Sequence, residues 1–306
     1  MRQRRERRER VNNGGTEERR NGKHFVQEAS HSSVSSFLCV IAVASVLSVS
    51  STQAQVRYAS GQNVVPVFEG WEHNADGSFN MVFGYMNRNY EEQVDVPVGG
   101  DNFLEPGAPD QGQPAHFYTR RQQFVFKVRV PKDWGKKDLV WTLTSHGKTE
   151  KAYASLMPVW EIDASVYQQN RGGPGELGEP DEAPTIKVEG GPSRTAAVNQ
   201  KLTFDAFVVD DGKPSNKPSQ SGSNARVEGP LRQAVVRLDR GVRLGVVWVV
   251  YRGDASAVTF EPQKIAVADG KASTSVRIAR PGTYMLRAYA DDGILLDSAD
   301  VTVTVR

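Results

Sequence analysis

The chain has 306 residues, which is enough for two ordinary domains, and it carries 38 basic and 36 acidic residues with one cysteine. Nine of the basic residues lie within residues 1–23, and without residues 1–54 the chain has 29 basic residues against 31 acidic ones. The chain after residue 54 therefore has no basic stripe, which argues against nucleic-acid binding. Its single cysteine, Cys39, lies before residue 54, so neither a disulfide nor thiol chemistry is expected after it.

Residues 1–54 are expected to be a signal peptide with a long basic n-region. The uncharged stretch has the apolar centre "FLCVIAVASVLSV" at 37–49, which is short for a helix that crosses a bilayer of about 30 Å. Small residues before Gln55 favour cleavage after Ala54. An uncleaved membrane anchor is the alternative. Cleavage would leave a secreted protein, extracellular or periplasmic, without a transmembrane helix.

Residues 56–163 are predicted to form an N-terminal β-sandwich module. Apolar and polar residues alternate in several short segments, which is typical of strands with one buried face and one exposed face. These segments are "FNMVFGY" at 79–85, "VDVPV" at 94–98, "FVFKVRV" at 124–130 and "LVWTL" at 139–143. Residues 99–121 are rich in Gly and Pro, so we expect a long loop there.

Residues 164–183 contain few apolar residues and are expected to be a Gly/Pro-rich linker. The segment 184–306 then shows seven short strand patterns, the number expected for an immunoglobulin-like sandwich. Trp248 lies in the third of these patterns, where such folds bury a tryptophan. Tyr284 follows a Pro-Gly corner at the start of the sixth, the position of a tyrosine corner. We therefore assign both residues structural roles in an all-β chain of two sandwiches.

The second domain resembles the PKD-like and cadherin-like immunoglobulin-fold modules of bacterial exported proteins. The segments that carry the resemblance are "LTFDAFVVDDGKP", "VVWVVYRGDASAVTFEP" and "PGTYMLRAYADDG". The first domain is similar to a module of bacterial extracellular proteins through "FGYMNRN", "VDVPVGGDNF", "PGAPDQGQPAHF" and "LVWTL". The resemblance implies export and adhesion or architectural roles, without a shared reaction.

Acidic residues are expected to gather at one end of the second sandwich. Strands alternate in direction, so the connections that follow the second and sixth strand patterns lie at the same end, where the linker also arrives. Oxygen ligands are those that Ca²⁺ prefers, so calcium is the one candidate cofactor. The candidate ligands are Asp181, Asp210, Asp211, Asp291 and Asp292. The alternative is that the Asp-Gly pairs are simply turns, because no recognised calcium motif is present.

Aromatic residues at strand ends or in loops offer another kind of site. Trp71, Trp134 and Trp160 are candidates for stacking on sugars or anchoring a protein, with Trp71, Trp134 and His116 of the long loop favoured for a sugar. The alternative is that the tryptophans pack at the rim of the core and that the histidine lies at the surface.

No nucleophile, phosphate-binding or dinucleotide motif occurs, so we expect no enzyme. The leading hypothesis is an exported, non-catalytic binding or architectural protein of the cell envelope or extracellular space, with a protein or polysaccharide of the cell surface as partner. A carbohydrate-binding protein that uses the loop aromatics is the runner-up. A third alternative is an envelope hydrolase.

Overall fold

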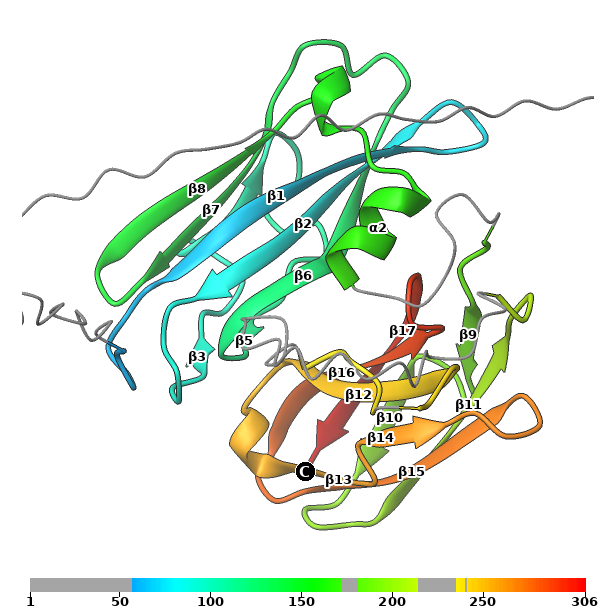
Figure 1. The fold of residues 1–306 in the computed structure, drawn as a ribbon. Helices are drawn as coiled ribbons and strands as arrows, with labels where there is room; N and C mark the ends of the chain where they lie inside the picture. Colours follow the sequence, from blue (N-terminus) through cyan, green and yellow to red (C-terminus); the bar gives the residue numbers. More distant parts are fainter. Residues whose placement is uncertain (1–56, 172–180, 214–234, 240) are drawn as a thin grey trace, which may run out of the picture. The chain divides into compact units, whose positions relative to one another are not determined.

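The computed structural model describes residues 57–171, 181–213, 235–239 and 241–306. The expected signal peptide therefore lies outside the described residues. Strands dominate the described part, and they group into two sandwiches that follow one another along the chain (Figure 1). The chain is thus all-β, as its alternating patterns predict, with a single α-helix, α2 (Ala164–Arg171), among the described residues.

The first sandwich contains a sheet of order β1-β2-β6, a sheet of order β4-β7-β8 and the short pair β3-β5. Its pairings are antiparallel. The strands are β1 (Val64–His73), β2 (Phe79–Asn87), β3 (Val94–Asp95), β4 (Asn102–Glu105), β5 (His116–Phe117), β6 (Arg120–Val130), β7 (Leu139–Ser145) and β8 (Lys148–Ala154). The stretch 99–121, expected to be a loop, thus contains β4, β5 and the start of β6.

Aromatic side chains from both larger sheets form the core of this sandwich. Trp141 of β7 is fully buried, and its ring meets those of Phe83 and Phe126 edge to face, with centroids 6.0 and 5.0 Å away. Its indole N–H donates a 2.9 Å hydrogen bond to Oδ1 of Asn102, so the polar atom of the ring is satisfied inside the core. The alternating residues of β2, β6 and β7 therefore do point inward, as their pattern requires.

The second sandwich has the strand order of an immunoglobulin fold. One sheet runs β13-β15-β11-β9 and the other β10-β17-β16-β12-β14. In strand letters these are D-E-B-A and A′-G-F-C, the two-sheet division of such domains. Strand β14, which follows strand D in the chain, pairs with the outer edge of C. The strands are β9 (Thr185–Val188), β10 (Ser193–Ala196), β11 (Leu202–Val209), β12 (Gly245–Arg252), β13 (Val258–Glu261), β14 (Lys264–Ala266), β15 (Lys271–Ile278), β16 (Gly282–Asp291) and β17 (Leu296–Val305).

Trp248 lies at the centre of this second core and is fully buried. Its ring is 5.2 Å from that of Phe204 and stacks with that of Phe260 at 6.4 Å. Tyr284 is also buried, and its hydroxyl donates a 3.1 Å hydrogen bond to the carbonyl of Arg280, four residues upstream. That bond ties the start of β16 to the connection from β15, which is the geometry of a tyrosine corner.

Short helical segments complete the described chain. The first eight residues of the stretch 164–183, expected to be a linker, form α2, while residues 172–180 lie outside the described part. Two 3-10 turns occupy Pro158–Trp160 and Ala255–Ala257. Among the residues that the structure describes, none of the helical segments could span a lipid bilayer.

Candidate functional site

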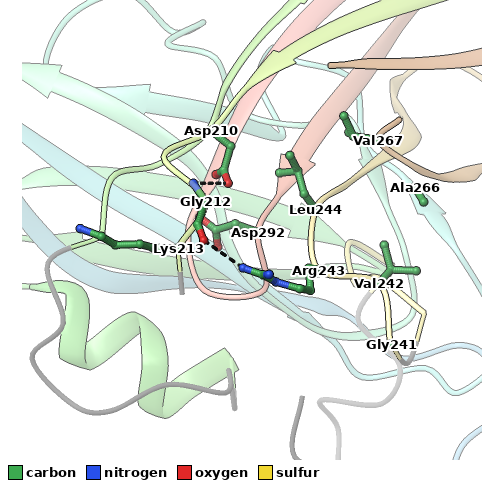
Figure 2. Close-up of a pocket in the computed structure, with 10 residues that line it drawn as sticks. All are labelled: Asp210, Gly212, Lys213, Gly241, Val242, Arg243, Leu244, Ala266, Val267 and Asp292. Atoms are coloured by element: carbon green, nitrogen blue, oxygen red, sulfur yellow. Dashed lines mark hydrogen bonds between the residues drawn. The ribbon is translucent and has the colours of Figure 1, made fainter. Parts of the chain in front are cut away.

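Three connections of the second sandwich meet around a hollow of about 490 Å³ (Figure 2). The β11–β12 connection contributes residues 210–213 after β11 and residues 241–244 before β12. Residues 266 and 267 lie at the end of β14 and at the start of the β14–β15 connection. Asp292, directly after β16, lines the same hollow. Alternating strand direction therefore brings these loops to one end of the sandwich, as the order of the strand patterns along the chain indicates.

Asp292 is the most deeply buried carboxylate at this hollow, with 4% of its surface exposed. Its Oδ1 accepts hydrogen bonds of 2.7 Å from the backbone N–H groups of both Ile294 and Leu295. Its Oδ2 is buried and accepts no hydrogen bond from any described residue. The pKa of Asp292 is raised to about 7, mainly by burial and also by the negative charges of Asp181 and Asp291, while the two N–H donors oppose the rise.

Asp210, directly after β11, has one bonded and one unbonded carboxylate oxygen in the same way as Asp292. Its Oδ2 accepts a 2.9 Å hydrogen bond from the N–H of Gly212, whereas its Oδ1 is buried without a partner among the described residues. Burial, and then the charge of neighbouring Asp211, raise the pKa of Asp210 above its ordinary value. The hollow thus has two buried carboxylate oxygens that accept no hydrogen bond from a described group, although the charge of Arg243 acts on Asp210 and opposes the rise of its pKa.

The five predicted calcium ligands do not converge on one point. Asp291 and Asp211 each accept a hydrogen bond from a backbone N–H two residues further on, from Gly293 at 2.8 Å and Lys213 at 2.9 Å. Such hydrogen bonds stabilise turns, and a turn was the alternative explanation for the Asp-Gly pairs. Within the described ranges, no three His, Cys, Asp or Glu side chains are close enough together to hold a metal ion. Calcium binding stays a prediction.

The turn that Asp292 stabilises also joins the two sandwiches. Ile294, at the tip of the β16–β17 hairpin, is buried in an apolar cluster with Val82 of β2, Phe124 of β6, and Tyr167 of α2. All of the described residues belong to one compact unit. The carboxylate of Asp292 therefore positions a contact between the sandwiches as well as a turn.

A second set of contacts covers an open edge of β12. Strand β14 pairs with β12 only as far as Val247. Beyond that point, the N–H of Val250 donates a 2.9 Å bond to the hydroxyl of Tyr118, and the carbonyl of Tyr251 accepts a 3.1 Å bond from the N–H of Ala115. The long connection of the first sandwich thus supplies partners to a strand of the second.

Polar side chains hold the same joint. The guanidinium of Arg252 makes two 2.8 Å bonds to the carboxylate of Asp110, which lowers the pKa of Asp110. The hydroxyl of Tyr289 donates to the carbonyl of Val125 at 2.9 Å, and Arg287 donates to the same carbonyl at 3.2 Å. These hydrogen bonds are directional, so each holds a group of one sandwich in place against a group of the other.

Sequence reasoning missed this joint, although the residues 245–251, "GVVWVVY", contain a signal for it. Val247, Val249 and Tyr251 are buried on the face opposite Trp248, so β12 is buried on both sides. A continuous apolar run is typical of a strand covered on both faces, in contrast to one with a wet face.

The expectation that Trp71 and Trp134 are accessible rings is wrong. Trp71 is 5% and Trp134 8% exposed, and their indole N–H groups donate to the carbonyls of Met157 at 2.8 Å and Lys137 at 2.7 Å. His116, expected at the surface or in a ligand site, is 4% exposed, and its ring nitrogens lie 2.7 Å from Asp95 and 2.7 Å from Gln93. These side chains close the rim of the first core. Trp160, at 47% exposed, is the accessible tryptophan of the described chain.

Comparison with known proteins assigns no family to this chain. No protein-family model and no curated protein matches the sequence. Among solved structures, the chain is similar to the S-layer protein rSbsC (12% identity, TM-score 0.24), covering 80% of this chain and 28% of that one. It is also similar to the D00-D0 domain of intimin (10%, TM-score 0.24), covering 79% of this chain and 100% of that one. A third likeness is to the N-terminal eight Ig domains of Down syndrome cell adhesion molecule (7%, TM-score 0.25), covering 79% and 27%. The chain therefore spans less than a third of the S-layer and cell-adhesion chains.

Proposed function

We propose that this chain is an exported, non-catalytic protein of the cell envelope or extracellular space, in which two sandwiches act as one stiff binding or architectural unit. The observation that carries the proposal is the hydrogen-bonded joint. Backbone and side-chain donors of β12 and β16 reach acceptors on β6 and on the long connection of the first sandwich.

A stiff joint favours an architectural role because it fixes the distance between surfaces on the two sandwiches. A flexible tether between independent sandwiches would leave each free to rotate, and their surfaces could not present a fixed pattern to a partner. Protein or polysaccharide of the cell surface remains the proposed kind of partner. The carbohydrate-binding alternative loses its physical basis at Trp71, His116 and Trp134, since their rings are buried.

Small-angle scattering from residues 57–306 tests the stiffness. We expect one narrow distribution of distances between the sandwiches for the unchanged chain and a broader one for the double variant Tyr118→Phe, Tyr289→Phe, which loses two hydroxyl bonds across the joint. Tyr153→Phe is the matched control, because Tyr153 is 60% exposed on β8. A broad distribution in the unchanged chain would contradict the proposal.

Export is tested separately by fractionating cells that produce the full chain. We expect the protein in the envelope or the medium, with an N-terminus at Gln55. Recovery of the intact chain from the cytoplasm would refute this part of the proposal and leave the stiffness of the joint unaffected.

A further inference from the structure

The hollow at the end of the second sandwich combines carboxylate oxygens that lack a hydrogen-bond donor with an apolar wall. Oδ2 of Asp292 and Oδ1 of Asp210 are buried and accept no hydrogen bond from the described residues. Buried oxygens of this kind destabilise the fold unless a donor reaches them. Side chains of Val242, Leu244 and Val267 line the same space.

The basic residues at the hollow have other contacts. Nη2 of Arg243 donates a 2.9 Å bond to the carbonyl of Gly212, which Figure 2 shows beside Asp210. Nζ of Lys213 lies 3.8 Å from Oδ2 of Asp211, which is not one of the two oxygens without a donor. Acidic groups outnumber basic ones here, since Asp181 and Asp291 also act on Asp292.

The size and lining of the hollow argue against a bare metal ion. Ca²⁺ requires six to eight oxygens in close contact, and the described side chains supply no converging set of three ligating groups. A volume of about 490 Å³ instead suits a molecular group, because small-molecule sites span roughly 300–1,000 Å³. A primary alkylammonium has a charged head for the carboxylates and an aliphatic stem for the apolar wall.

We propose that this hollow binds a primary alkylammonium group, the chemistry of a lysine side chain, with its N–H donors directed at Oδ2 of Asp292 and Oδ1 of Asp210. Three donors on one nitrogen can serve both oxygens. The site goes beyond the proposed stiff unit, because it does not depend on whether the joint is rigid.

Binding should increase as Asp292 loses its proton. The groups that face this carboxylate are Asp181, Asp291 and the hollow's Asp210, Lys213 and Arg243. Burial, and then the acidic neighbours, favour the protonated form of Asp292, so a cationic ligand must compete with the proton, and affinity rises with pH through neutrality.

The experiment titrates the purified full chain with n-butylammonium chloride at constant ionic strength and follows binding by ligand-observed NMR. We expect a Kd on the order of 5 mM at pH 8. Affinity should fall about tenfold at pH 5, because protonation removes the charge of Asp292. It should fall by a similar factor in Asp292→Asn and in Asp210→Asn, because each removes one charged acceptor.

Asp269→Asn is the matched control. Asp269 is exposed in the β14–β15 turn with φ of 51°, a conformation that Asn also tolerates, and it does not line the hollow. Since Asp210 lies on a different connection from the β16–β17 turn, its variant reports on binding even if Asp292→Asn disturbs the fold.

Three results would overturn the proposal. Equal binding of n-butanol would show an apolar hollow without charge recognition. Unchanged affinity in both aspartate variants would place the amine elsewhere. Stabilisation by millimolar Ca²⁺ with no butylammonium binding would assign the oxygens to a divalent cation.

Discussion

The guanidinium carbon of Arg287 lies 3.5 Å from the centroid of the Tyr251 ring, while Nε and Nη2 of the same side chain bond to Asp300 at 2.6 and 2.8 Å. The charge is 8% exposed, yet it is paired, stacked on a ring and bonded to the carbonyl of Val125. Burial acts to lower the pKa of Arg287, but the nearby tyrosines and Asp300 outweigh it and raise that pKa. Arg287 thus joins β16, β17 and the first sandwich.

Arg287→Lys should lower the free energy of unfolding by about 2 kcal/mol, because an ammonium keeps the charge but loses the two-pronged bond to Asp300 and the flat stacking surface. Urea unfolding measures the difference. Arg277→Lys, on the exposed side of β15, should change stability by less than about 0.5 kcal/mol. Equal effects of the two substitutions would mean that the geometry of Arg287 contributes nothing.

Asp292→Asn should stabilise the protein at pH 8. The folded chain holds this proton more tightly than the unfolded chain does, because the pKa rises from 3.8 to about 7 on folding. The stability supplied by the group is fully present below pH 4 and is lost as pH rises through 7. One pKa unit corresponds to about 1.4 kcal/mol, and solvent in the hollow weakens the effect, so we expect a gain of about 2 kcal/mol.

The check on Asp292→Asn is a pair of melting curves for each protein, at pH 4 and pH 8. Asn keeps an oxygen to accept from Ile294 and Leu295, so the two proteins should melt at similar temperatures at pH 4. A variant that is less stable at both pH values would show that the charged form of Asp292 is favourable in the fold.

Gly70→Ala should destabilise the first sandwich by about 3 kcal/mol or more. A Cβ at Gly70 would lie 2.4 Å from the carbonyl oxygen of Trp160 and 2.5 Å from Cγ1 of Ile162, and φ there is 140°. Crowding and backbone strain act together at this position. Gly77→Ala, in an open turn with φ of 81°, adds strain alone and should cost about 1 kcal/mol. Urea midpoints compare the two, and a mild Gly70 variant would mean that the Pro158–Trp160 turn moves easily.

Tyr284→Phe should lower the free energy of unfolding by about 1 kcal/mol, the contribution of a typical hydrogen bond. The ring stays buried, so the change isolates the bond from the hydroxyl to the carbonyl of Arg280. Thermal unfolding at several urea concentrations measures it. An unchanged stability would show that ring packing alone fixes this corner.

Local alternation was enough to predict β2, β3, β6 and β7 of the first sandwich and most strands of the second, because one-sided burial leaves a period of two in the sequence. In the first sandwich it missed β1 and β8, as well as β4 and β5 inside the expected loop. It missed β10, whose residues "SRTA" contain a single buried apolar side chain and pair in parallel with β17. Trp71 and Trp134 follow no periodic pattern, so their burial depends on contacts with distant segments such as Met157. Strand direction predicted that Asp210 and Asp292 lie at the same end of the sandwich, but the distances between the aspartates depend on turn geometry.

The unpaired stretch of β12 has a consequence for experiments on separated domains. In the intact chain the N–H of Val250 and the carbonyl of Tyr251 are occupied by Tyr118 and Ala115. A fragment that begins at residue 181 would keep its immunoglobulin strand order but expose these groups beside apolar Val249. Such an edge is a template for β-pairing with another molecule, so the isolated second sandwich should self-associate at concentrations where the whole chain stays monodisperse. The first sandwich thus protects this edge of the second from pairing with another molecule.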